Sequence, residues 1–122
     1  MQELSNNIHP LARKFVQSLL DGRFDQAHQM LSDEFAKEYT SDLLQETFEA
    51  MSEFEEGARL TKIDDECVMM PHWPEKQSND VSWNYVSVSG ETDGFCMVEA
   101  VTVIIATVGG RECIREIEWG RP

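Results

Sequence analysis

Residues 95–108, FCMVEAVTVIIATV, decide the fold of this chain because they are apolar on both faces of a strand. Successive residues of a strand point to opposite sides of the sheet. One side of this strand carries Phe95, Met97, Val101, Val103 and Ile105. The other side carries Cys96, Val98, Ala100, Ile104, Ala106 and Val108. An antiparallel sheet in a small domain usually buries one face only. We therefore predict that helices of the same chain cover one face and that a second copy of the protein covers the other.

The first half of the chain has the spacing of helices. Apolar residues recur at steps of three and four, as on one face of a helix, at Ile8, Leu11, Ala12, Phe15, Val16, Leu19 and Leu20. Asn6 or Asn7 can cap this helix, Pro10 fits its first turn, and Gly22 suits its end.

Two short helices and one longer helix are predicted to follow. Asp25 and Ser32 are the expected caps of the short helices, and residues 40–42 offer three caps for the longer one. The longer helix is expected to end at Gly57. Its predicted inward residues are Leu43, Leu44, Phe48, Met51 and Phe54.

Strands occupy the second half of the chain. A first strand is predicted over residues 58–70, with an acidic interruption at 64–66, and a loop with two prolines follows it to residue 80. The next strand covers 81–89 and includes a twist or bulge, and Gly109-Gly110 closes a tight hairpin into a last strand over 111–119. The expected fold is one α+β domain over residues 1–122, with helices at about 7–55 packed on a curved antiparallel sheet at about 58–119.

The composition limits the partners that the protein can have. The 122 residues include 23 acidic and 10 basic side chains, a net charge of −13, which repels nucleic acid and anionic membrane surfaces. Three cysteines, Cys67, Cys96 and Cys113, give no paired framework or metal spacing. No secretion signal or bilayer-spanning run is recognisable, so we expect a cytoplasmic protein.

Four segments together resemble one known superfamily. They are A-x-x-F-V-x-x-L-x-D-G-x-F-x-x-A at 12–27, L-S-x-E-F at 31–35, S-x-x-L at 41–44 and G-G-R-x-x-I-R-E-I-E-W at 109–119. With them the chain resembles the nuclear transport factor 2-like (cystatin-like α+β) superfamily. The resemblance implies a cone-shaped half-barrel, a pocket between the helices and the concave sheet face, and a homodimer through the outer sheet face. The superfamily includes isomerases, dehydratases, cyclases, transport adaptors and immunity proteins, so the fold does not choose an activity.

Glu99 is the most conspicuous polar residue, because its neighbours on the strand face are apolar. Burial there would raise its pKa and suit it to proton transfer, with Tyr85 and Trp83 of the preceding strand close enough to help. The alternative is that Glu99 pairs with Arg115 or Arg111, or marks a wet spot in the dimer face. No stretch matches the active-site pattern of the isomerase-like enzymes, so no catalytic role is carried over. The candidate ligand-binding residues are Trp83, Tyr85, Glu99, Phe48 and Tyr39.

The remaining chemistry-bearing residues give weaker patterns. His28 and His72 stand apart from each other, and Cys67 with His72 lacks a second ligand pair, so we expect neither a metal nor a cofactor. The segment 69–74 is either a lid or partner-contact loop or an ordinary loop with a buried Trp73.

Three hypotheses of function therefore stand. The first is a non-catalytic domain that forms a homodimer and binds a small apolar ligand or a protein. The second is an isomerase or lyase of the ketosteroid-isomerase-like kind, with Glu99 as base and Tyr85 as donor. The third is an acidic immunity-type protein that binds a basic toxin.

Overall fold

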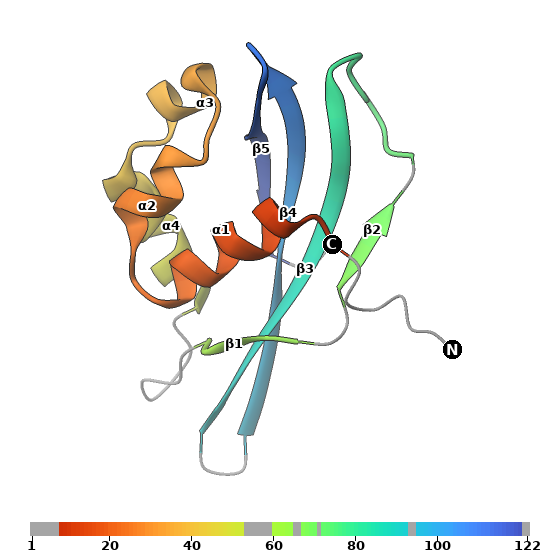
Figure 1. Ribbon diagram of the computed structural model, residues 1–122. Helices are drawn as coiled ribbons and strands as arrows, with labels where there is room; N and C mark the ends of the chain where they lie inside the picture. The colour runs from red at the N-terminus through yellow and green to blue at the C-terminus, as the bar shows by residue number, and fades with distance from the viewer. Residues whose placement is uncertain (1–7, 53–59, 65–66, 71, 93–94, 121–122) are drawn as a thin grey trace.

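The computed structural model describes residues 8–52, 60–64, 67–70, 72–92 and 95–120, and for 91, 92 and 95–97 only the strand backbone. Helices come first in this described part of the chain and strands follow (Figure 1). The helices are α1 (Pro10–Leu20), α2 (Phe24–Gln29), α3 (Asp33–Glu38) and α4 (Ser41–Ser52). The strands are β1 (Lys62–Ile63), β2 (Val68–Met70), β3 (Asp80–Thr92), β4 (Phe95–Val108) and β5 (Arg111–Trp119).

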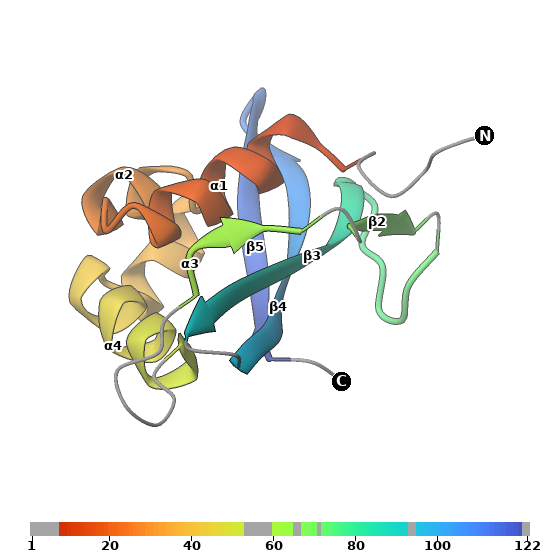
Figure 2. The same ribbon diagram turned by 90° about the horizontal axis from the view of Figure 1, so that it is seen from below.

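The strands form one open antiparallel sheet in the order β1-β3-β4-β5, and β2 also pairs with β3. The helices lie together on one side of this sheet (Figures 1 and 2). Contacts join α1 to β1, β3 and β4, and they join α3 and α4 to β5. The predicted α+β class, with N-terminal helices packed on an antiparallel sheet, is confirmed.

The two faces of β4 have different covers. Val101, Val103 and Ile105 are fully buried in one core with Phe15 and Leu19 of α1, so the predicted helical cover of this face is confirmed. We call the opposite side the outer face. Its β4 residues Ala100, Ile104 and Ala106 are also buried within the single chain, while Val108 at the hairpin is exposed.

The start of α1 differs from the prediction. Its N-cap is His9, whose Nδ1 accepts a hydrogen bond from the Leu11 N–H at 3.0 Å, so Asn6 and Asn7 are not the cap and lie outside the described residues. The His9 backbone N–H donates to Oδ1 of the fully buried Asn84 on β3 at 2.9 Å, which ties the helix start to the sheet. Pro10 occupies the first helical position as expected.

Two of the other predicted caps are confirmed and one is wrong. The Ser32 hydroxyl accepts from the Phe35 N–H, and the Thr40 hydroxyl accepts from the Leu43 N–H. Asp25 lies inside the first turn of α2, because that helix already begins at Phe24. Its negative charge there still stabilises the helix through the favourable interaction with the helix dipole.

The inward face of α4 is narrower than predicted. Leu44 and Phe48 are buried and Met51 packs against the core, whereas Leu43 is exposed. Successive residues of a helix point about 100° apart, and in α4 it is Leu44 that points to the core while Leu43 points to solvent. Phe54 and Gly57 lie outside the described residues.

In the described part of residues 58–70, two short strands, β1 and β2, stand where one strand was predicted. β1 pairs with Val88 and Ser89 of β3, and β2 pairs with residues 83–85, which come earlier in the same strand. Asp64 lies just after β1. The Asp64 carboxylate accepts hydrogen bonds from the hydroxyls of Ser87 and Ser89, so the acidic residue is held at the sheet edge where the pairing breaks.

The hairpin between β4 and β5 has the turn that the sequence predicts. Gly109 and Gly110 have positive φ angles of 60° and 79°, and β5 has its predicted bounds. β3 is longer than predicted and contains the expected irregularity between Asp80 and Ser82.

Candidate functional site

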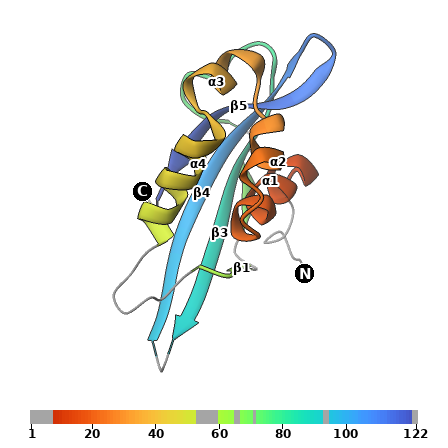
Figure 3. The ribbon, with the colours of Figure 1, turned by 90° about the vertical axis from the view of Figure 1, so that its left-hand side faces the viewer.

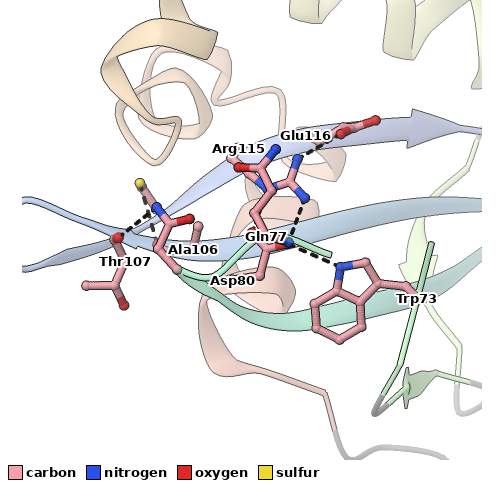
Figure 4. Close-up of polar contacts among 9 residues, drawn as sticks. Trp73, Gln77, Asp80, Ala106, Thr107, Arg115 and Glu116 are labelled. Atoms are coloured by element: carbon pink, nitrogen blue, oxygen red, sulfur yellow. Dashed lines mark hydrogen bonds and ion pairs between the residues drawn. The ribbon is translucent and has the colours of Figure 1, made fainter. Parts of the chain in front are cut away.

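A bulge in β5 aims Arg115 across the sheet. Ile104 pairs with Glu116 and Ile105 pairs with Ile114, so Arg115 is an extra residue without a partner on β4. Such bulges redirect the side chain of the inserted residue. Arg115 reaches Asp80, the first residue of β3 (Figure 4).

The contact between these two side chains is a bidentate ion pair. Arg115 Nε donates to Asp80 Oδ1 at 2.6 Å, and Arg115 Nη2 donates to Oδ2 at 2.7 Å. The Arg115 side chain is 14% exposed and that of Asp80 is 0% exposed. Because β4 lies between β3 and β5, the pair crosses β4 on the outer face, where Asp80 opposes the small Ala106. This ion pair, formed within one chain, therefore covers part of the outer face, where the sequence predicts a second copy of the protein.

Asp80 also holds the loop that precedes it. Its Oδ2 accepts from the Gln77 backbone N–H at 2.8 Å and from Trp73 Nε1–H at 3.2 Å. Burial by itself would raise the pKa of Asp80. The hydrogen bonds from Arg115, Gln77 and Trp73, with the charge of Arg115, outweigh burial and lower that pKa.

The Trp73 ring is itself partly covered. It is half-buried, and the Lys76 ammonium lies 4.6 Å from its centroid. The loop before β3 is therefore fixed to the sheet at Asp80.

An open cavity of about 760 Å³ lies beside this ion pair, at the edge of β5. It lies between α3 and the loop before β3, which contributes Gln77 to the lining. In Figure 3 this loop arches to the top of the sheet. Its lining residues are Ser32, Glu34, Phe35, Lys37, Glu38, Tyr39, Gln77, Arg115, Glu116 and Ile117.

Only Tyr39 of the predicted ligand-binding residues lines this cavity. Its ring packs against Phe35 at 5.1 Å between centroids, and its hydroxyl accepts from Trp119 Nε1–H at 3.2 Å. Phe48 is buried in the core against Phe24, with ring centroids 6.3 Å apart.

Glu99 and Tyr85 lie on opposite faces of the sheet. Glu99 pairs with Val88, on the face that the helices cover, whereas Tyr85 pairs with Thr102 on the outer face. The prediction that Tyr85 and Trp83 stand near Glu99 is wrong, because residues an even number apart share a face and these differ from Val88 by odd numbers. Arg115 and Arg111, the other partners considered for Glu99, pair with Asp80 and Asp33.

Trp83 and Tyr85 belong instead to an apolar patch on the outer face. Their rings stack at 6.5 Å with an interplanar angle of 16°. Val68 and Met70 of β2 pair with Tyr85 and Trp83, so they point to the same side, and each is 42% exposed. We call these four residues the β2–β3 patch.

The sequence analysis missed the Asp80–Arg115 pair, although one pattern could have indicated it. Ile114 and Ile117 are both buried but three residues apart, which breaks the period of two in a strand. Such a break indicates an inserted residue among the two polar residues between them, Arg115 and Glu116, and the register identifies it as Arg115.

Comparison with protein-family models, with curated proteins and with solved structures gave no match for this chain. Within the described ranges, no helix is both long enough and apolar enough to cross a membrane, and no three His, Cys, Asp or Glu side chains converge as metal ligands would. The His28 ring nitrogen Nε2 lies 3.1 Å from the Ala36 carbonyl, so this histidine bridges α2 and α3.

Proposed function

We propose that the protein is a non-catalytic, protein-binding domain that forms a homodimer through the β2–β3 patch. The observation that carries the proposal is the exposure of Val68 and Met70 beside the stacked Trp83 and Tyr85. Aromatic residues and methionine are enriched at the centres of protein interfaces, and charged residues are depleted there. The patch has this composition.

A second copy is the occupant that the charge favours. A two-fold interface brings the same surface of each subunit together, so charged residues near the axis meet their own kind. Two chains with a net charge of −13 each repel one another least where charge is absent, and the β2–β3 patch contains no charged residue. We propose that this dimer is a cone-shaped half-barrel of the nuclear transport factor 2-like kind and that it works in the cytoplasm, where the buried cysteines Cys67 and Cys113 stay reduced.

Catalysis of the isomerase kind has less support than binding. That hypothesis needs Glu99 and Tyr85 on one side of the sheet, and the register separates them. The homodimer needs only the patch.

Substituting Met70 by glutamate tests the dimer. A carboxylate in the centre of the interface loses its water, so we expect the dimer dissociation constant to rise by about ten- to a hundredfold in sedimentation equilibrium. Met69→Glu is the matched control, because Met69 is a neighbour on the same strand with 38% exposure but pairs with Asn84 and points to the other side. Equal effects of the two substitutions, or a wild-type protein that stays monomeric at 0.1 mM (about 10⁻⁴ M), would exclude the proposed interface.

The acidity keeps an immunity-type function as a second candidate, and salt separates it from the dimer. Two chains of −13 repel, so screening strengthens the homodimer as salt rises from about 0.05 to 0.5 M. Binding of a basic toxin weakens over the same range. Sedimentation of the protein alone in this salt series gives the sign, and a dimer that dissociates as salt is added contradicts an uncharged interface.

A further inference from the structure

We propose that the cavity at the edge of β5 binds a basic, extended peptide segment, with an arginine side chain of that segment between α3 and the loop before β3. This site is separate from the β2–β3 patch and goes beyond the homodimer. Three properties of the cavity support it: its charge, its aromatic wall and the strand edge beside it.

The charge around the cavity is negative. Carboxylates of Glu34, Glu38 and Glu116 line it, and that of Asp80 lies behind Arg115. The cations there are Lys37 and Arg115, and Arg115 is already bound to Asp80 and to Glu116, the latter at 3.0 Å. The positive charge of Arg115 is therefore offset by these two carboxylates, and the exposed carboxylates of α3 outnumber Lys37, so the cavity favours a cation.

The wall of the cavity suits a planar cation. The rings of Phe35 and Tyr39 lie side by side with an interplanar angle of 38°, and Ile117 extends this apolar surface. A guanidinium group stacks on aromatic faces while its N–H groups donate to carboxylates. An arginine side chain fits both parts of this lining better than a small inorganic cation.

The strand edge beside the cavity suits a peptide. β5 is the last strand of the sheet, and Ile114 pairs there with the segment before α3: its N–H donates to the Met30 carbonyl, and its carbonyl accepts from the Ser32 N–H, each at 2.8 Å. After Ser32 the chain turns into α3, so in the described structure no strand continues this pairing along residues 115–117, which line the cavity. An extended peptide can add itself to such an edge.

The test uses the 122-residue chain and the peptide acetyl-Val-Arg-Val-Arg-Val-amide. We expect the peptide to shift the NMR signals of the Arg115, Glu116 and Ile117 backbone amides and of the Gln77 side chain. A peptide with citrulline in place of arginine should bind about tenfold more weakly, because it keeps the shape and loses the charge.

Two double variants separate the cavity from the general acidity. E38Q/E116Q should weaken binding about tenfold, and E46Q/E118Q by less than about twofold. Both remove two exposed carboxylates, one from a helix and one from β5, so the net charge changes equally. Equal melting temperatures of the two variants will show that both are folded.

Three outcomes overturn the proposal: equal weakening in both variants, no binding of the peptide at about millimolar concentration, or agmatine binding as tightly as the peptide with the same signals shifted. The last result would assign a site for free cations. The dimer constant of E38Q/E116Q should equal that of E46Q/E118Q, so loss of peptide binding leaves the homodimer proposal standing, and the reverse also holds.

Discussion

Replacing Arg115 by methionine is expected to lower the free energy of unfolding by about 3–5 kcal/mol at pH 7. Methionine keeps most of the apolar stem but leaves the Asp80 carboxylate, which is 0% exposed, without its cation. A buried charge without a partner is among the most destabilising changes that a fold can undergo. Urea denaturation followed by tryptophan fluorescence measures the loss.

The double variant Asp80→Leu/Arg115→Met is the control for this prediction. It removes both charges, so it should be more stable than Arg115→Met alone, although the Gln77 N–H and the Trp73 indole lose their acceptor. If the free energy of unfolding of Arg115→Met stays within about 1 kcal/mol of that of the unmodified protein, the pair behaves as an exposed salt bridge. The description of a buried ion pair across β4 would then be wrong.

The pH dependence of this effect has a definite sign. The folded-state pKa of Asp80 lies below its ordinary value of 3.8, so its stabilising contribution is present above that value and is lost as the pH falls through the folded pKa. Arg115→Met removes the hydrogen bonds and the charge of Arg115 that lower this pKa, so the pKa of Asp80 is higher than in the unmodified protein and protonation relieves the unpaired charge at a higher pH. The difference in unfolding free energy between the two proteins should therefore shrink as the pH falls from 7 to about 4.

The order of elements could be predicted from the sequence because each rests on local patterns. The apolar stripe from Ala12 to Leu19, the hydroxyl cap at Ser32 and the Gly109-Gly110 hairpin are set by neighbouring residues, and all three were found. The cap of α1 was missed because His9 is an uncommon cap. The position of His9 is held by the hydrogen bond from its backbone N–H to the Asn84 side chain, which lies 75 residues away in the sequence.

The candidate site depends on pairing between distant strands, which a single sequence does not contain. Glu99 and Tyr85 were placed together because both lie in apolar strands, but the register puts them on opposite faces. Asp80 and Arg115 are 35 residues apart, and each lies at a shift in strand register, one in β3 and one in β5, that the sequence does not state. A two-faced apolar strand indicated that the outer face needs a cover, and part of that cover is a charged pair from the same chain.

Leu44→Ala is expected to lower the free energy of unfolding by about 2–5 kcal/mol, and Leu43→Ala by less than about 1 kcal/mol. The Leu44 side chain is 0% exposed, so its loss leaves a cavity between α4 and the core, whereas Leu43 is 37% exposed and water fills its place. Because the two leucines are adjacent, both substitutions change the helix propensity of α4 alike, and only burial distinguishes them. Urea denaturation of the two variants measures the difference. Equal losses would mean that the face of α4 packed on the core is rotated from the one described, and with it the position of α3 and the cavity wall.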